Sequence, residues 1–257
     1  MIHRISRSRY CDYDYEQWVK YFQENAGRRL QIDFSEEAGL SPEEKQLIFP
    51  SMTAFQRGEQ SEGTSLQRAA QRFAREQEEP FYPEAVRLFI QEENMHSAYL
   101  AQYMAHYGVE RRKSIFLDRL FRKFRRGQGI YTEAAVLVTA EMIALSYYTA
   151  LGKATKSEAL KSICRQMLHD ELPHIVFQSY TLGHDRTLGK GLKRSLLMSV
   201  SSVAVWLAYS NLLRAGGYGL IRFLIENHMH LMESKIIASR YRLRHNSRNT
   251  VPAGIRT

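Results

Sequence analysis

Two copies of a Glu-x-x-His motif constrain the fold of this chain more than any other feature. In both, a Glu and a His stand three positions apart and a second acid precedes the Glu: Glu92-Glu93-Asn94-Met95-His96 and Asp170-Glu171-Leu172-Pro173-His174. Residues three apart lie on one face of an α-helix, so each motif can present a carboxylate and an imidazole to the same point. One such motif arises by chance in many proteins, whereas two with matching preceding acids indicate a shared metal site.

The sequence around these motifs is predicted to be helical. Apolar residues recur at helical spacing, and only six prolines and 15 glycines interrupt 257 residues. Ser41 followed by Pro42 is typical of a helix start, with Ser at the N-cap and Pro at the first helical position. We therefore expect an all-α fold with four long helices and two further ones, at about 50–77, 83–107, 130–151, 156–181, 192–214 and 219–240.

We find no linker or repeat that divides the chain, so we expect a single domain over residues 1–240 with its core bundle at about 50–182. Residues 241–257 are polar and basic, which predicts a disordered tail. Cys11 and Cys164 provide no disulfide framework, and the first residues lack the apolar segment of a secretory signal. A cytoplasmic location is therefore expected.

Glu141 is the single charged residue in the apolar stretch 134–145. Its neighbours on the expected helix include Leu137, Val138 and Leu145. A carboxylate on such a face cannot stay ionised without a partner, because desolvation costs several kcal/mol. Glu141 must therefore be protonated, paired with a cation or bound to a metal.

Sequence spacing adds a fourth acid to the expected site. Glu141 precedes Glu171 by 30 positions, and Glu62 precedes Glu93 by 31. Near-equal spacing brings such acids level in two antiparallel helix pairs, although Glu59, one turn earlier, could replace Glu62. The resulting set has a Glu from each of two helices and a Glu-x-x-His from each of the other two: Glu62, Glu93, His96, Glu141, Glu171 and His174.

The acid before each motif is expected to orient the histidine of the other motif. A metal-bound His normally donates its second N–H to a carboxylate, which predicts that Asp170 contacts His96 and that Glu92 contacts His174. Four carboxylates balance two divalent ions, and oxygen and imidazole ligands suit iron or manganese. Solvated helix charges and structural histidines would explain either motif alone but explain the whole set poorly.

The two motifs resemble those of the acyl-carrier-protein desaturases of plants and bacteria. Residues 92–96 are similar to their Glu-Glu-Asn-Arg-His, and residues 170–174 to their Asp-Glu-Lys-Arg-His. The resemblance covers about residues 50–182 and implies a ferritin-like four-helix bundle with additional N- and C-terminal helices, a di-iron centre and O₂-dependent oxidation. The small subunit of ribonucleotide reductase and the arylamine N-oxygenases share the general pattern.

Several positions depart from these families. Pro173 replaces a basic residue of the desaturase motif, the chain is shorter than the plant desaturases, and the C-terminal third has no recognised counterpart. Met167 stands four residues before Glu171, where we looked for the extra histidine ligand of the N-oxygenases. These departures bear on the substrate rather than on the metal site.

We expect an oxygen-activating di-iron oxidase or oxygenase, with Glu141 and Glu171 as its catalytic carboxylates and O₂ as co-substrate. A fatty-acyl or carrier-tethered chain would lie beside Glu141, and a protein such as a ferredoxin would supply electrons to a homodimer. An N-oxygenase or hydroxylase acting on an amine or aromatic group is the alternative among enzymes. A metal-storage or redox-stress protein, or a basic membrane-associated protein with purely structural motifs, are the alternatives from other classes.

The net charge of +9, from 36 Lys and Arg against 27 Asp and Glu, suits an acidic carrier protein or an anionic membrane surface. A basic amphipathic helix at about 111–126 could dock such a partner, although a solvated cationic face explains it equally well. No aromatic-rich binding motif accompanies it, so a nucleic acid is not expected. Residues 195–213 lack charge, but five serines and Asn211 favour a buried or membrane-surface helix over a transmembrane span.

Overall fold

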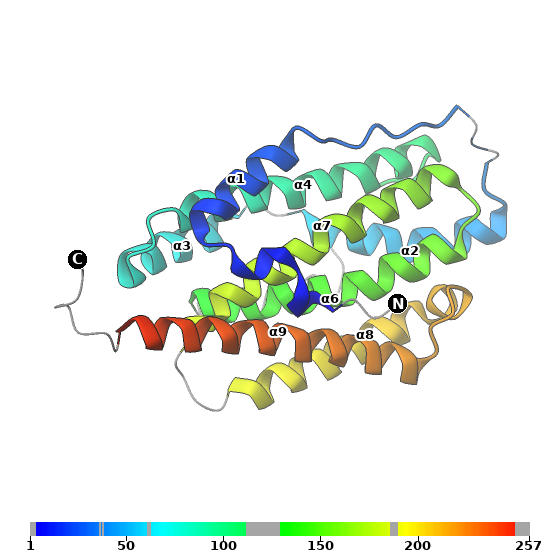
Figure 1. Cartoon of the computed structure of the whole chain (residues 1–257). Coiled ribbons are helices and arrows are strands. Elements are labelled where there is room, and N and C mark those ends of the chain that lie inside the picture. Colours follow the sequence, from blue (N-terminus) through cyan, green and yellow to red (C-terminus); the bar gives the residue numbers. More distant parts are fainter. Residues whose placement is uncertain are drawn as a thin grey trace.

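The part of the chain that the structure describes is helical and contains no strand, as the sequence predicts. The computed structural model describes residues 4–35, 37, 39–60, 63–111, 129–185 and 190–249. The helices in this part are η1 (Ile5–Arg7), η2 (Arg9–Asp12), α1 (Tyr15–Ala26), α2 (Pro42–Glu59), α3 (Thr64–Gln77), α4 (Tyr82–His106), α6 (Ile130–Ala154), α7 (Glu158–Gly183), α8 (Lys190–Ala215) and α9 (Leu220–Asn249) (Figure 1).

Local hydrogen bonds explain where α2 begins. The Ser41 hydroxyl accepts the backbone N–H of Glu44 at 3.2 Å, and the Glu44 carboxylate accepts the backbone N–H of Ser41 at 3.0 Å. This reciprocal pair satisfies two N–H groups that have no partner within the helix, and Pro42 occupies the first helical position. The predicted helix start at Ser41 is confirmed.

Helices α2, α4, α6 and α7 form the bundle that holds the two Glu-x-x-His motifs. α6 packs along α7, α2 packs along α4, and α4 also contacts α7. Aromatic side chains fill much of the space between them, for example Phe55 of α2, whose ring stacks on Tyr147 of α6 with the centroids 3.5 Å apart. α1 lies over α4 on the outside of this bundle (Figure 1).

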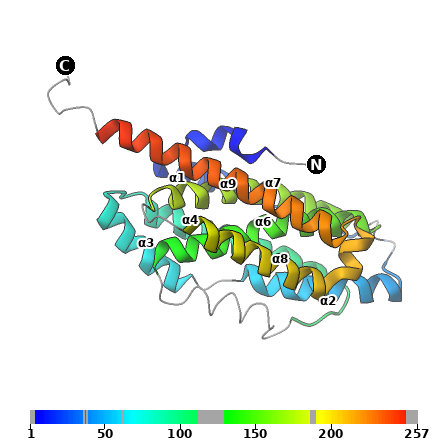
Figure 2. The same cartoon turned by 90° about the horizontal axis from the view of Figure 1, so that it is seen from below.

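Helices α8 and α9 form an outer layer on the bundle. α8 packs against α6, α9 packs against α7, and the two pack against each other (Figures 1 and 2). The backbone of α8 bends at Tyr209, where φ is −131° and ψ is 28°. Near the N-terminus of the chain, η1 contacts α9.

Two predicted boundaries are wrong. The helix expected at 50–77 is two helices, because α2 ends at Glu59 and α3 begins at Thr64 after Gly63, whose φ of 67° favours glycine. The tail expected from residue 241 begins later, because α9 continues to Asn249. The basic helix expected at about 111–126 falls almost wholly in residues 112–128, which lie outside the described residues, as does the rest of the tail.

Two of the described helices are long and apolar enough to cross a membrane. One is α6, in which 78% of the apolar window is buried, as in the core helix of a bundle. The other is Gly191–Ala215 in α8, in which 33% of the window is buried. Length and composition alone therefore do not separate these two helices, but their burial does.

The contact between the end of α8 and α6 depends on Gly216. A Cβ atom at this position would collide with the backbone of Ala150 in α6. We therefore expect Gly216→Ala to lower the free energy of unfolding by about 1–3 kcal/mol, the usual effect of inserting atoms into a packed interior. Urea unfolding followed by circular dichroism measures this change.

Gly191→Ala is the matched control, because nothing lies within 4 Å of a Cβ built at Gly191 near the start of α8. It should leave the unfolding free energy unchanged or raise it slightly, since alanine favours a helix over glycine. Equal stability of the two variants would contradict the close packing at Gly216.

Candidate metal centre

Acidic and imidazole side chains from four helices meet in the core of the bundle. Each is at most 9% exposed: Glu59 from α2, Glu93 and His96 from α4, Glu141 from α6, and Glu171 and His174 from α7. The i, i+3 spacing in α4 and α7 turns the Glu and the His of each motif to the same side, as the sequence predicts. The structure therefore brings both motifs and Glu141 together.

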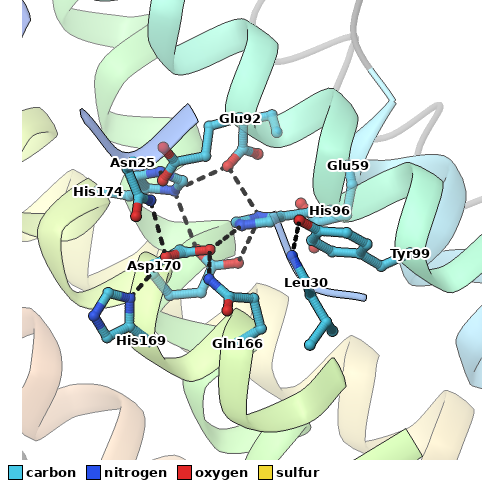
Figure 3. A network of polar contacts seen from close by, with 12 residues as sticks. Asn25, Leu30, Glu59, Glu92, His96, Tyr99, Gln166, His169, Asp170 and His174 are labelled. Atoms are coloured by element: carbon cyan, nitrogen blue, oxygen red, sulfur yellow. Dashed lines mark hydrogen bonds and ion pairs between the residues drawn. The ribbon is translucent and has the colours of Figure 1, made fainter. Parts of the chain in front are cut away.

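The outer nitrogen of each histidine is held by an acid from the opposite helix (Figure 3). His96 Nε2 on α4 lies 3.2 Å from Asp170 Oδ2 on α7, and His174 Nε2 on α7 lies 2.9 Å from Glu92 Oε1 on α4. Both contacts were predicted from the sequence, and both are confirmed. A carboxylate acceptor at Nε2 keeps the proton there and leaves the Nδ1 lone pair available as a ligand.

The inner nitrogens of the two histidines face the other acids. His174 Nδ1 lies 2.9 Å from Glu93 Oε1 and 3.7 Å from Glu171 Oε2. His96 Nδ1 lies 3.7 Å from Glu93 Oε1 and 3.8 Å from Glu171 Oε1. Potential ligand atoms of both kinds thus converge on one region between α4 and α7.

Seven of the converging atoms are buried and have no hydrogen bond of good geometry among the described residues, although two of them, His174 Nδ1 and Glu93 Oε1, lie 2.9 Å apart. They are Glu93 Oε1, His96 Nδ1, both carboxylate oxygens of Glu141, both of Glu171, and His174 Nδ1. A buried polar atom without a partner destabilises a protein by about 1–3 kcal/mol, and native structures contain few of them. So many in one place fit a site whose missing partner is a cation.

Burial and mutual repulsion hinder ionisation of the acids. Burial, together with the charges of Glu93 and Glu171, holds the pKa of Glu59 well above its usual range. Burial does the same to the pKa of Glu141 and raises that of Glu171, in spite of the nearby histidines. For Glu93, burial is outweighed by His174 and His96, which lower its pKa. A bound cation would replace protons and relieve this conflict.

Asp170 is the centre of a polar network behind His96. Besides His96, it accepts hydrogen bonds from Asn25 Nδ2 at 3.1 Å, from Gln166 Nε2 at 2.7 Å and from His169 Nδ1 at 2.8 Å. Burial raises the pKa of Asp170, but the bonds from His169 and His96 outweigh it and hold the pKa far below its usual range. Asp170 is therefore a fixed anion.

The charge of Asp170 affects the pKa of His96. Burial lowers the pKa of His96, but its bond to Asp170 and the charges of Glu171 and Glu93 raise that pKa to about 9. A cation at His96 Nδ1 would therefore compete with a proton for that nitrogen. This competition is the ordinary behaviour of a metal-binding histidine.

On the side of Asp170 away from the glutamate cluster, the polar network lies near the protein surface. His169 beside Asp170 has a side chain that is 58% exposed. It lines a depression of about 280 Å³ together with residues of η2, of α1 and of the segment after α1, among them the cations Arg9, Lys20 and Arg28. No sequence motif marks α1 as a neighbour of the site, because a single asparagine such as Asn25 forms no recognisable pattern.

The potential ligands fall into overlapping groups whose members lie within 4.8 Å of one another. One comprises Glu59, Glu93, His96 and Glu171, another Glu141, Glu171 and His174, and a third Glu93, His96 and His174. Glu171 joins the first two groups, and Glu93 joins the first and third. The cluster could therefore hold metal, with these two acids in the middle.

Glu59, the alternative to Glu62 as the first-helix ligand, lies in the cluster. It is the last residue of α2, and its Oε1 accepts a hydrogen bond from the Tyr148 hydroxyl of α6 at 2.7 Å. Glu62 lies outside the described residues, so its assignment stays a prediction. Tyr148 stands seven residues after Glu141 on the same helix, a spacing that could have marked it as a neighbour of the site.

Glu141→Gln tests the burial of charge in the cluster. The amide keeps the shape of the side chain but cannot become an anionic ligand, so we expect metal affinity to fall by more than about 100-fold. The metal-free variant should keep or exceed the melting temperature of the unaltered protein, because one ionisable group that resists burial is gone. Metal content and thermal unfolding with and without Fe²⁺ measure both effects.

Glu133→Gln is the matched control on the same helix. Glu133 is also buried, but its Oε1 accepts a hydrogen bond from Ser65 at 2.7 Å and it belongs to none of the groups above. This variant should retain full metal content. Stoichiometric metal in Glu141→Gln would contradict the ligand assignment.

Asp170→Asn tests the support behind His96. An asparagine offers one acceptor oxygen where the carboxylate offers two, so some of the four donors around Asp170 lose their acceptor. We expect metal affinity to fall by about 10–100-fold while the helices stay folded. Competition titration with a chelator measures the affinity. Glu158→Gln, at an exposed position of the same helix, should change nothing, and an unaltered affinity in Asp170→Asn would refute the role of Asp170.

Comparison with known proteins adds no relative: no family model, no curated protein and no solved structure matches the chain. The chain is all-helical in its described part and carries a buried cluster of carboxylates and histidines that is compatible with a di-iron site.

Proposed function

We propose that this chain is a ferritin-like di-iron protein that uses O₂ to oxidise an organic substrate. The observation that carries the proposal is the set of buried, unpartnered ligand atoms between two histidines whose outer nitrogens are already held by acids. In this arrangement each outer histidine nitrogen has a carboxylate partner, and the unpartnered atoms of the cluster are those that would face metal. Structural ion pairs would instead leave few atoms without partners.

The grouping of ligands supports two ions rather than one. Glu59 belongs with His96 and Glu141 with His174, while Glu93 and Glu171 are shared between the two sides. Two divalent ions carry four positive charges, and the four glutamates carry four negative ones when ionised. The loaded site would therefore be near neutral, which lowers the desolvation penalty of placing it in a core.

The ligand types favour iron or manganese. Imidazole nitrogens and carboxylate oxygens suit both metals, and none of the clustered side chains is a thiol that would favour zinc or copper(I). A Glu from each of two helices and a Glu-x-x-His from each of the other two is the ligand pattern of ferritin-like di-iron and di-manganese proteins. This pattern also supports the ferritin-like assignment of the bundle formed by α2, α4, α6 and α7.

Iron in its reduced state would supply the electrons that O₂ takes up, which no side chain of this cluster can supply. The protein side chains would bind the metal, fix its position and keep bulk water away. Phe89 packs edge-on to the His174 ring, with centroids 4.9 Å apart, and Phe22 lies 6.0 Å from it. The Tyr148 hydroxyl would hold Glu59 in place by its hydrogen bond.

The substrate proposal rests on the motif resemblance and on the apolar surroundings of Glu141. We propose a fatty-acyl or carrier-tethered chain beside Glu141, with desaturation or hydroxylation as the outcome. The net charge of +9 favours an acidic carrier protein, and an electron donor such as a ferredoxin would complete the cycle. An N-oxygenase finds less support, because Met167 stands at the position expected for an extra histidine ligand.

Iron loading under anaerobic conditions, followed by exposure to O₂, tests the proposal. We expect about two irons per chain, a transient visible absorption after mixing with O₂, and loss of both in the Glu141→Gln variant. Incubation with acyl carriers and mass spectrometry should then show loss of two hydrogens or gain of one oxygen. Glu133→Gln should behave like the unaltered protein.

Other outcomes separate the alternatives. Continued uptake of iron far beyond two per chain, with no change in any acyl substrate, would indicate storage rather than oxygenation. Oxidation of an amine or aromatic group in place of an acyl chain would indicate the N-oxygenase or hydroxylase alternative. No stoichiometric metal under any of these conditions would defeat the proposal.

A further inference from the structure

The outer layer of the fold exposes large apolar side chains in two rows. They are Leu192, Leu196, Val200, Val203 and Leu207 on α8, and Ile221, Ile225, Met229, Met232 and Ile236 on α9, with exposed fractions from 36% to 80%. Their spacing of three or four residues places each row on one face of its helix. We call these ten residues the α8–α9 face.

Side-chain hydrogen bonds between the two helices fix their antiparallel register. They join Lys235 Nζ to Ser195 Oγ at 2.9 Å, His228 Nε2 to Ser199 Oγ at 3.1 Å, and Asn227 Nδ2 to Ser202 Oγ at 3.1 Å. The residue numbers in these pairs add to between 427 and 430, so residues whose numbers add to about 428 lie nearly level with each other. This register decides how the two exposed rows are placed.

The two rows lie level with each other in this register. Leu196 is level with Met232, and Val203 is level with Ile225. In both helices the exposed row is turned in the same rotational direction from the residues that form the hydrogen bonds between α8 and α9. Because the helices are antiparallel, this offset places both rows on the same side of the pair. The α8–α9 face is therefore a single apolar surface along both helices, larger than the scattered apolar residues normal on a soluble monomer.

The charges of this outer layer are strongly one-sided. Residues 190–249 contain ten Lys and Arg against two Glu, a net +8 of the +9 of the whole chain. Both acids are engaged inside the protein: Glu226 accepts the Tyr218 hydroxyl at 2.7 Å, and Glu233 accepts the backbone N–H of Ser6 at 2.8 Å. The layer thus presents cations without exposed acids among its described residues.

The exposed cations stand at the ends of the apolar surface. Lys193 lies at the start of α8, beside the end of the row on α9, and Arg214 lies at the opposite end. Arg222 lies near Arg214, but its Nε is 3.7 Å from Glu226 Oε2 and its Nη1 donates to the Gly217 carbonyl at 3.0 Å. The guanidinium of Arg214 lies over the Trp206 ring at 4.8 Å. An apolar face with basic residues around it is the pattern of helices that lie in the interface of an anionic bilayer.

We propose that the α8–α9 face rests on the surface of an anionic lipid bilayer, with both helices parallel to its plane. The apolar rows would enter the boundary between headgroups and acyl chains, and Lys193 and Arg214 would contact lipid phosphates. A second copy of the chain fits this face less well, because it would bring two layers of like charge together.

The buried face of α8 argues against this helix crossing the bilayer. Met198, Val205 and Leu212 are buried in the protein, and Ser202 holds Asn227 of α9. A span would expose these contacts to lipid and pull α8 away from α6. The described packing is therefore retained only if the helix lies on the membrane surface.

Vesicle flotation of the full chain tests the proposal. We expect binding to vesicles of phosphatidylglycerol and phosphatidylcholine, little binding to pure phosphatidylcholine, and weaker binding at high salt. Replacing Leu196, Val203 and Ile225 together by Gln should weaken binding by roughly tenfold or more. Lys193→Gln with Arg214→Gln should weaken it by about fivefold for each charge.

Lys153→Gln with Lys156→Gln is the matched charge control, because both lysines are exposed at the end of α6 and in the loop after it. It should bind like the unaltered protein. All variants should bind as much metal as the unaltered protein, since none of the candidate ligands found among the described residues lies on α8 or α9. If the triple variant does not fold by circular dichroism, Leu207→Gln with Ile221→Gln probes the other end of the same face.

Three results would overturn the proposal. The first is equal binding of the folded face variant and the unaltered protein, and the second is equal binding to neutral and anionic vesicles. The third is a dimer in sedimentation velocity that dissociates in the face variant while vesicles are not bound. That result would assign the face to a second copy of the chain.

Discussion

The burial of four glutamates in one core is the constraint on which the rest of this structure depends. Like charges this close cannot all remain ionised without a cation, and burial raises the pKa values of Glu59, Glu141 and Glu171. A bundle selected for stability alone would replace such groups by apolar ones. Their presence, together with the absence of hydrogen-bond partners for most of their described oxygens, is what points to a function.

The contacts of the two histidines link α4 and α7 at the site. His96 on α4 is held by Asp170 on α7, and His174 on α7 is held by Glu92 on α4. Each helix therefore supplies both a candidate ligand and the carboxylate that holds the candidate ligand of the other helix. Asn25 extends this network to α1, so that a helix with no ligand of its own still helps to hold the site in place.

The sequence predicted those parts of the site that follow from helical periodicity. Residues three apart must share a face, which sufficed for both motifs and for the exchange of anchors between Asp170 and Glu92. It did not suffice for Glu59, because Glu59 and Glu62 share a face only if the helix is continuous, and α2 ends between them. The helix ends because Gln60 is extended, with a φ of −74° and a ψ of 116°, and Asn25 reaches Asp170 only through the packing of α1 on the bundle. Neither leaves a periodic pattern in the sequence.

The six clustered residues differ in how easily their backbones can move, because Glu59 lies at the end of α2. Glu93, His96, Glu141, Glu171 and His174 lie in the interiors of helices of 25 or 26 residues, so moving any of their backbones disturbs packing along a whole helix. Glu59 is the terminal residue of its helix and is tethered by the Tyr148 hydroxyl. Glu59, on the His96 side, is therefore the clustered residue whose backbone can move with the least disturbance of packing. The two halves of the site differ in rigidity for this reason.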